Sequence, residues 1–492
     1  MTADRDHGAN PYLPEGVYIP DGEVHVFGDR AYLLGSQDRF GGPLFCMEDY
    51  EVWSAPVGDL TEWTRHGVAY RKEQDPYNDG SHPNPSNDAE GGMHDLYAPD
   101  FCRGLDGRYY LYYCLAEISR VGVAVADEPI GPYEFLDYVR DASGAIVGER
   151  PGDLFQFDPA VLVDEGRVYL YTGCGPMNRA QRWFQPSAER HSMVTEVAAD
   201  MITAIGDPHR LIPNIFDSLG TGFEGHELFE ASSIRRVGDA YCLVYSDVHL
   251  HNLVHATADH PMGPFTYRGV LVSNGDFGLD GRSGLLGGSM PYGNNHGCVE
   301  QIDGRWYVFS HRHTDGRQAS RQAWGEPIDL LSDGSFARVR LSSSGLRGAP
   351  LPGVGRYSAR IASRLTAWWG GSTFSMLRER LQPRLTQEEG PDGPRQYIDG
   401  LTSGSTVGFR SFTELGSALS VAYRGTARGR IDVTSRGGDL LARIPVAPSE
   451  HWIDSAPQVI DQPSGEVELE FTFRGRGRLA FVAFELTGEP GS

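Results

Sequence analysis

Five side chains with acid–base character recur at a similar place in five parts of this chain. They are Asp21, Asp100, Asp158, Glu230 and His296, and each lies six to nine residues before the acidic residue of a repeated turn. Carboxyl groups that lie close together in a cavity with little water repel one another, which raises the pKa of some and leaves others ionised. A protonated carboxyl beside an ionised one is the pair that hydrolysis of a glycosidic bond requires. We therefore expect this set to carry acid–base chemistry.

The turn that follows each of these side chains predicts the fold. It contains Gly and usually an acidic residue, and an aromatic-containing strand of alternating apolar residues follows it, in segments 28–36, 106–113, 165–173, 238–246 and 303–311. Asp-Gly and Gly-Asp permit the positive φ of tight hairpins. The turn acids are 77, 59, 74 and 64 residues apart, and each interval is long enough for a four-stranded sheet. Five such sheets predict a five-bladed β-propeller, whose innermost strands begin at one end of a central channel.

The composition fits an all-β chain and excludes several classes of partner. Lys and Arg total 43 against 66 Asp and Glu, so the formal charge is −23, and such a surface repels nucleic acid. The 62 Gly and 31 Pro residues favour a turn-rich chain over a helical bundle. No apolar run approaches the roughly 20 residues of a membrane span, and the first residues lack the apolar core of a secretory signal. We expect no nucleic-acid or membrane partner and a cytoplasmic location.

The propeller pattern stops before residue 348, and a second domain follows. Residues 348–355 are rich in Gly and Pro and predict a linker, which divides the chain into domains 1–347 and 348–492. Alternating apolar residues at 428–435, 439–446, 466–475 and 478–486 predict the strands of a β-sandwich. Residues 357–365 predict its first strand, and residues 375–382 have a helical pattern.

Longer stretches around the acidic residues carry a family resemblance. The segments LYAPDFCRGLDGRYYLYYC, FQFDPAVLVDEGRVYLYTG, FEASSIRRVGDAYCLVYSD and NNHGCVEQIDGRWYVFSHRHT resemble glycoside hydrolase family 43, and the resemblance covers about residues 10–345. It implies a five-bladed propeller that cleaves arabinofuranosides, xylosides, arabinans or galactans with inversion. It further implies that Asp21 is the general base, that Asp158 orients the acid and tunes its pKa, and that Glu230 is the general acid.

Two of these assignments have rivals close by in the sequence. Glu224 and Glu227 compete with Glu230, but they belong to the preceding Gly-containing loop rather than to the start of the strand. Glu23 competes with Asp21 and would share its face only in an already regular strand. Inversion leaves room for a water molecule, so the resemblance predicts about 6.5–9.5 Å between the carboxyl groups of the base and the acid.

Sugars present hydroxyl groups and C–H faces, so we expect the rest of the pocket to be polar and aromatic. The residues expected to contact the substrate are Asp38, Phe40, Asp100, His296, Arg312 and Arg321. The plain alternative for Asp100 is a turn cap, and that for Arg312 is a surface ion pair. The long loops 70–95 and 274–295 are rich in Gly, Asn and Pro and could wall this cavity, which favours the removal of terminal sugars.

We expect the reaction to require no cofactor. The resemblance allows a structural calcium ion on the propeller axis with His296 beside it, although a neutral imidazole is a poor ligand for so hard a cation. No dense run of oxygen ligands predicts another metal site, and the six cysteines lack zinc spacing.

The second domain weakly resembles carbohydrate-binding module family 6, in residues 396–412 and in later segments such as GRIDV and FVAFEL. Tyr397 and Trp452 are candidates for a sugar-stacking site. Their alternative is a place in the core of the sandwich.

The resemblance implies the release of a terminal pentose from plant-type oligosaccharides or polysaccharide side chains, with α-L-arabinofuranose as the leading sugar. A β-xylosidase and a galactan-active hydrolase are the alternatives within the family. A non-catalytic glycan-binding propeller is the alternative outside it, and the presence of all three acids argues against it. Tyr97 and Gln37 stand where many family members have Trp and His, so the sugar does not follow from the resemblance.

Overall fold

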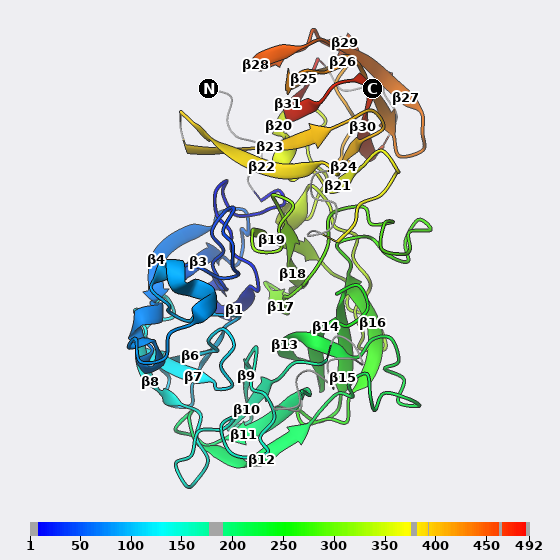
Figure 1. Cartoon of the computed structure of the whole chain (residues 1–492). Coiled ribbons are helices and arrows are strands. Elements are labelled where there is room, and N and C mark those ends of the chain that lie inside the picture. The colour runs from blue at the N-terminus through cyan, green and yellow to red at the C-terminus, as the bar shows by residue number, and fades with distance from the viewer. Residues whose placement is uncertain (1–7, 177–189, 375–380, 392, 462–464, 489–492) are drawn as a thin grey trace.

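The computed structural model describes residues 8–176, 190–374, 381–391, 393–461 and 465–488. Five antiparallel sheets are arranged in a ring, and a two-sheet sandwich lies at one side of it (Figure 1). This confirms the all-β class, the five-bladed propeller and the C-terminal β-sandwich that the sequence predicts.

Each sheet of the ring is one blade, with its strands in chain order from the axis outward. Blade 1 contains β1 (Glu23–Phe27), β2 (Arg30–Leu34), β3 (Tyr50–Pro56) and β4 (Thr64–Tyr70). Blade 2 contains β5 (Asp100–Arg103), β6 (Tyr109–Tyr113), β7 (Gly122–Ala126) and β8 (Glu134–Tyr138). Blade 3 contains β9 (Ala160–Asp164), β10 (Arg167–Thr172), β11 (Met193–Val197) and β12 (Ala204–Arg210). Blade 4 contains β13 (Leu228–Val237), β14 (Ala240–Asp247), β15 (Leu253–Ala258) and β16 (Thr266–Val272). Blade 5 contains β17 (Val299–Ile302), β18 (Arg305–His313) and β19 (Arg321–Pro327).

The repeated turn joins the first and second strands of every blade, as the sequence predicts. The second strands β2, β6, β10, β14 and β18 all follow it directly. In blades 3 and 5 the acidic turn residues Glu165 and Asp303 themselves have positive φ (50° and 49°), and the Gly after each does too. Such two-residue turns match the right-handed twist of the strands they connect, so the turn chemistry fixes the register of each hairpin.

Blade 5 has three strands among the described residues, where four were predicted. The outer edge of β19 is covered by the N-terminal segment instead. The Asn10 side chain accepts a hydrogen bond from the Gly325 backbone amide (3.0 Å) and donates one to the Gly325 carbonyl (3.0 Å). This side chain satisfies backbone groups that a fourth strand would otherwise pair.

The sandwich has one sheet of seven strands and one of five. The larger sheet contains β20 (Gly355–Ser358), β22 (Arg384–Gly390), β23 (Gly393–Leu401), β25 (Ala418–Gly425), β28 (Ser449–Asp454), β29 (Gln458–Val459) and β31 (Leu479–Thr487). The smaller sheet contains β21 (Arg364–Thr366), β24 (Thr406–Phe412), β26 (Arg428–Ser435), β27 (Leu440–Val446) and β30 (Val467–Arg476). The four predicted strands correspond to β26, β27, β30 and β31.

The single strand predicted over 357–365 is wrong. The chain there forms β20, then the short 3-10 helix η5 (Ala359–Ile361), then β21 in the other sheet. The Ser358 hydroxyl caps η5 by accepting from the Arg360 amide (3.3 Å), so a local capping interaction interrupts the alternating pattern. Most of the helical pattern predicted at 375–382 lies outside the described residues.

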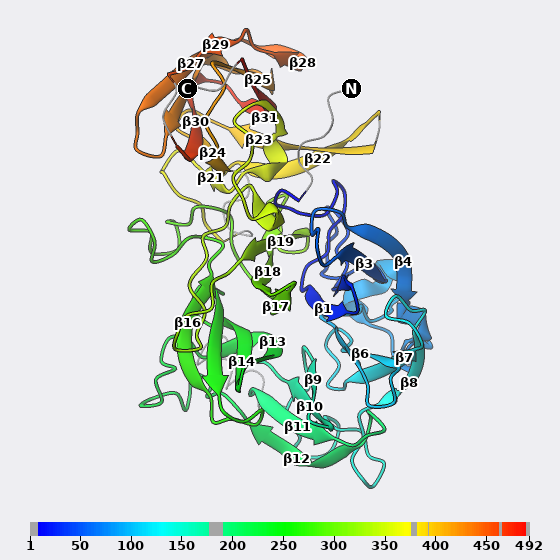
Figure 2. The same cartoon turned by 180° about the vertical axis from the view of Figure 1, so that it is seen from behind.

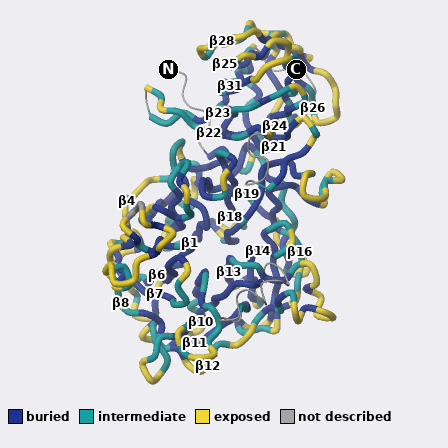
Figure 3. Tube along the Cα trace, viewed as in Figure 1, coloured by how far each residue is buried: buried dark blue, intermediate teal, exposed yellow. Residues whose placement is uncertain are grey.

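One hydrophobic core joins the propeller to the sandwich. In both views the sandwich lies next to β19 of blade 5 (Figures 1 and 2). The core combines blade residues and sandwich residues, among them Val244, Leu271, Trp324, Tyr357, Phe409 and Phe484. Buried stretches of chain follow this contact, and exposed stretches gather at the outer turns of the ring (Figure 3).

The other helices among the described residues are short 3-10 turns. Loop 70–95 contains η1 (Lys72–Gln74), η2 (Pro76–Asn78) and η3 (Pro85–Glu90), and η4 (Gly345–Arg347) precedes the sandwich. Loop 70–95 is held against blade 2, where Asp75 accepts hydrogen bonds from the hydroxyls of Tyr113 (2.6 Å) and Tyr138 (2.5 Å). Among the described residues, no helix has the length and apolar character to span a membrane.

Candidate active site

Asp21 and Asp158 occupy equivalent places in blades 1 and 3, two residues before β1 and β9. Both have positive φ (55° and 42°), so the chain turns sharply just before the strand begins. Glu230 lies inside β13, where the pairing with β14 shifts register on both sides of it. Such irregularities re-aim a side chain, and here Ala231, which follows Glu230, donates its amide hydrogen to Asp158 Oδ2 (3.1 Å).

Asp21 is held in a shell of nitrogen atoms. Its Oδ1 accepts a hydrogen bond from Arg321 Nη1 (2.8 Å), and Nδ1 of His311 and of His296 lie 3.4 Å and 3.8 Å from the same oxygen. Burial opposes ionisation of this carboxyl, but the Arg321 guanidinium, together with the two neighbouring histidines and the Ser36 hydroxyl, outweighs burial, and the pKa of Asp21 is lowered below its ordinary value. Asp21 is therefore ionised at neutral pH.

Glu230 is shifted in the opposite direction. Burial, together with the negative charge of Asp21, raises the pKa of Glu230 to about 8. Burial and the charges of Glu230 and Asp21 likewise raise the pKa of Asp158 well above its ordinary value. Glu230 is protonated at neutral pH, so the cluster combines a proton donor with an ionised carboxylate.

The two histidines beside Asp21 are neutral. Burial lowers the pKa of His296 to about 4 and that of His311 to about 3, against the opposing effect of Asp21. His296 Nδ1 also lies 3.9 Å from Asp158 Oδ2, so this ring lies between the two aspartates. Neutral imidazoles supply hydrogen-bonding groups here without adding a positive charge, which leaves Arg321 as the main counter-ion of Asp21.

Some of the predicted substrate residues lie in this cluster and others lie around it. Asp38 accepts hydrogen bonds from Arg321 Nε (2.8 Å) and Nη2 (3.0 Å), so it fixes the guanidinium that pairs with Asp21. Phe40 packs against Tyr18, with ring centroids 5.4 Å apart. His296 and Arg321 lie directly beside Asp21.

Arg312 and Asp100 lie elsewhere. The Arg312 guanidinium is buried and donates to the carbonyls of Arg360 (2.6 Å) and Ala362 (3.1 Å), so it faces the sandwich rather than the acids. Arg312, which we expected to contact the substrate, therefore makes an interdomain contact instead. Asp100 is completely buried, and its Oδ2 accepts from the Val161 amide of blade 3 (2.8 Å).

The rivals of the proposed acids are engaged in other contacts. Glu227 accepts a hydrogen bond from the Ser218 hydroxyl (2.6 Å), and Glu224 is exposed in its loop and accepts from the Gly220 amide. Glu23 Oε2 accepts from Arg235 Nη2 (2.8 Å) in a separate cluster. These contacts favour Asp21 and Glu230 as the reacting pair.

That separate cluster lies where the innermost strands meet, and it is a candidate place for the structural calcium ion that the resemblance allows on the axis. His296, which the resemblance places beside such an ion, lies next to Asp21 instead. Glu23, His25 and Asp100 place one potential ligand atom each within 4.8 Å of the others. Asp100 Oδ1 lies 2.7 Å from His25 Nε2, and Arg235 bridges Glu23 to Glu300, with Nε 2.6 Å from Glu300 Oε2. Calcium prefers six to eight oxygen ligands, whereas this group offers few free oxygens and already holds a buried guanidinium. The residues present here do not fit a calcium ion.

Two neighbours of the acids were not among the predicted site residues. The positive charge of Arg190 partly offsets the rise in the pKa of Glu230, and its guanidinium lies 4.7 Å from the centroid of the Phe155 ring. His311 lies next to Asp21. His311 directly precedes Arg312 in β18, and the alternation along this strand turns the two side chains to opposite sides. The alternation shows that His311 and Arg312 cannot both face the acids.

The predicted stacking residues of the sandwich contact each other and charged groups. The rings of Tyr397 and Trp452 are 5.2 Å apart, and the Arg424 guanidinium lies 4.3 Å from the Trp452 ring centroid. Trp452 Nε1 donates to Glu388 (2.7 Å). A cation on the indole ring takes a position that a stacked sugar would need.

Comparison with known proteins adds a family to this geometry. The sequence model described as Glycosyl hydrolases family 43 matches residues 10–336. A protein named Xylosidase/arabinosidase from Thermoclostridium stercorarium is 43% identical over 97% of this chain and 98% of its own length. One named Arabinoxylan arabinofuranohydrolase from Paenibacillus polymyxa is 27% identical over 97% of this chain and 72% of its own. The crystal structure of a family 43 arabinoxylan arabinofuranohydrolase from Bacillus subtilis, in complex with cellotetraose, covers 99% of both chains with a TM-score of 0.50 and 20% identity, a likeness of fold.

Proposed function

Since the chain belongs to glycosyl hydrolases family 43, and is thereby a glycosidase, we propose that it releases terminal pentoses with inversion and that α-L-arabinofuranose is its leading substrate. The observation that carries the proposal is the opposite shift of two neighbouring carboxyls, with the pKa of Asp21 lowered and that of Glu230 raised to about 8. At neutral pH this pair holds the protonation states that glycoside hydrolysis by inversion needs.

In the proposed reaction Asp21 takes a proton from a water molecule while the oxygen of that water attacks the anomeric carbon. Glu230 gives its proton to the glycosidic oxygen as the bond to the leaving group breaks. Asp158, which accepts from the Ala231 amide, orients the chain at Glu230, and the negative charge of Asp21 helps the acid to hold its proton. Arg321 and Asp38 keep Asp21 ionised and in place.

The names of the relatives support a pentose. The names of the relatives from Thermoclostridium stercorarium and Paenibacillus polymyxa both include an arabinose-releasing activity. The name of the first relative also includes xylosidase. A β-xylosidase is therefore the second candidate. For both sugars the proposed source is the side chains or ends of plant-type oligosaccharides and polysaccharides.

The test compares nitrophenol release from α-L-arabinofuranoside, β-xyloside and β-galactoside by the wild type, Glu230→Gln and the exposed control Glu224→Gln. We expect cleavage of a pentoside, a loss of roughly 10²-fold or more in Glu230→Gln, and wild-type rates in the control. Nitrophenol leaves readily, so an arabinoxylan oligosaccharide with a poor leaving group is measured in parallel, where the loss should be larger. Cleavage of no glycoside by the wild type would favour the glycan-binding alternative.

A further inference from the structure

Loop 274–295 connects β16 to β17, and both of its ends contact a histidine of the active site. The Asn274 side chain donates to the His311 carbonyl (3.0 Å), and Nε2 of the same histidine hydrogen-bonds the Asn294 carbonyl. The other ring nitrogen of His311 lies 3.4 Å from Asp21 Oδ1. A displacement of this loop would therefore move the ring that touches Asp21.

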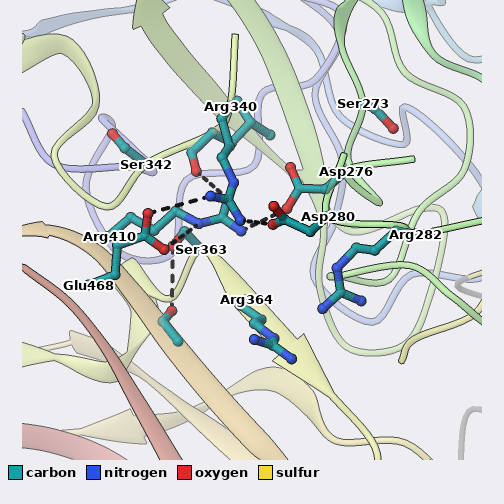
Figure 4. A network of polar contacts seen from close by, with 12 residues as sticks. Ser273, Asp276, Asp280, Arg282, Arg340, Ser342, Ser363, Arg364, Arg410 and Glu468 are labelled. Atoms are coloured by element: carbon teal, nitrogen blue, oxygen red, sulfur yellow. Dashed lines mark hydrogen bonds and ion pairs between the residues drawn. The ribbon is translucent and has the colours of Figure 1, made fainter. Parts of the chain in front are cut away.

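The first part of the loop is held by the sandwich as well as by Arg338 and Arg340 of the propeller domain, which donate to the Phe277 carbonyl and to Asp280. Arg410 on β24 donates from Nη2 to Asp276 Oδ2 (2.7 Å), and both side chains are almost fully buried, at 7% and 3% exposure (Figure 4). Arg410 Nη1 also donates to the Leu341 carbonyl (2.8 Å). Removing one partner of a buried ion pair leaves the other without compensation, so this contact resists opening.

A second group of ion pairs surrounds the first at the surface. Arg436 donates to Asp280 (2.8 Å) and to Glu468 (3.2 Å), and its side chain is 49% exposed. Exposed pairs of this kind contribute little to stability. Arg436 thus joins the same loop to the same domain as Arg410 does, but without burial.

Backbone pairing and an aromatic contact add to the hold on the loop. Ser372 and Gly288 exchange two backbone hydrogen bonds (2.7 and 3.0 Å). The Phe374 ring packs against Tyr292 of the loop (5.6 Å between centroids) and against His251 (5.7 Å). His251 in turn packs against Phe229 (4.5 Å), the residue before Glu230.

We propose that the β-sandwich is a working part of the active site, in which the Asp276–Arg410 pair and the contacts of Ser372 and Phe374 hold loop 274–295 in the position that orients His311 on Asp21. Asp276 and Arg410 are positioning residues, and they touch no substrate. The inference concerns this chain's own loop and rests on the proposed function only for its activity readout.

The test compares Asp276→Asn, Arg410→Met and Arg410→Lys with the matched control Arg436→Met in the full chain. Hydrogen exchange of peptides covering 274–295 is measured together with kcat and KM for the best nitrophenyl pentoside, at a temperature where circular dichroism shows each variant folded. We expect faster exchange confined to the loop and the His311 peptide in Asp276→Asn and Arg410→Met. Their kcat/KM should fall about 10- to 100-fold, mainly in kcat, since small misplacements of reacting groups have effects of this size.

Arg410→Lys keeps the charge and should recover part of the activity, and Arg436→Met should stay within about 2-fold of the wild type. If Arg410→Met does not fold, Phe374→Ala tests the same loop at a less buried contact. Faster exchange in the loop with unchanged kcat/KM would overturn the proposal, as would unchanged exchange. If the wild type cleaves no pentoside, the proposed function fails, whereas the exchange measurements still decide whether the pair holds the loop and His311.

Discussion

The raised pKa of Glu230 has a consequence for stability that needs no substrate to measure. The ordinary pKa of the Glu230 carboxyl is 4.5, and in the folded protein it is about 8. Between these two pH values the folded protein keeps a proton that the unfolded chain has released. The unfolded state then binds fewer protons than the folded state, so the free energy of unfolding falls as pH rises through this window. Glu230→Gln cannot ionise, and the variant should escape this loss.

The magnitude follows from the width of the window. About 3.5 pH units separate 4.5 from 8, and each corresponds to about 1.36 kcal/mol, so the variant should gain at most about 5 kcal/mol over the wild type at pH 9 and about 3 kcal/mol at pH 7. At pH 4.5 the two proteins should be nearly equal. The change that removes the acid is thus expected to stabilise the fold in alkaline solution.

The assay is urea unfolding of both proteins at several pH values between 4.5 and 9, followed by fluorescence. Glu224→Gln serves as the control, because that carboxyl is exposed and hydrogen bonds from its own loop lower its pKa, so its removal should give no alkaline gain. A stability difference between Glu230→Gln and the wild type that does not grow with pH would refute the reasoning. Glu230 would then be ionised in the folded protein and could not be the acid.

Three further predictions concern the same residues and the axis. The kcat/KM of the wild type should fall on the alkaline side with an apparent pKa near 8, as Glu230 loses its proton, and a pH–rate profile checks this. Arg321→Met should move the acidic limb to higher pH and lower kcat, because Asp21 loses the charge that keeps its pKa low; an unmoved limb would contradict this role. Arg235→Met should destabilise the chain by about 3–5 kcal/mol, because it leaves Glu23 and Glu300 without their buried partner, and urea unfolding checks this.

The ring of blades could be predicted from the sequence because its signal is local. Each hairpin needs a positive φ at the turn. An acidic residue followed by Gly, as at Glu165 and Asp303, indicates such a turn from two adjacent residues. The acids Asp21, Asp158 and Glu230 stand at a similar offset from those turns, so the repeat alone was enough to predict that they lie together.

Features that depend on distant partners could not be predicted in the same way. The destination of Arg312 is set by the carbonyls of Arg360 and Ala362, about 50 residues later in another domain. The covering of the outer edge of β19 depends on Asn10, which is 315 residues away from Gly325. Such contacts have no periodicity, and nothing near Arg312 or Gly325 in the sequence signals them.

The charged cluster of Glu23 also links all five blades. Glu300 of blade 5 pairs with Arg235 of blade 4, which pairs with Glu23 of blade 1 and lies 3.4 Å from His25 of the same blade. That histidine hydrogen-bonds Asp100 of blade 2, and Asp100 accepts from the Val161 amide of blade 3.

Opening the ring at any junction other than that of blades 3 and 4 would break a contact of a buried charged group in this cluster, and the hydrogen bond from the Ala231 amide to Asp158 joins blades 3 and 4. The propeller should therefore open as one cooperative unit rather than blade by blade. Partly open rings, which would present unpaired strand edges to other molecules, should then be rare, so the contacts that join the blades at the axis also protect the protein from edge-to-edge aggregation.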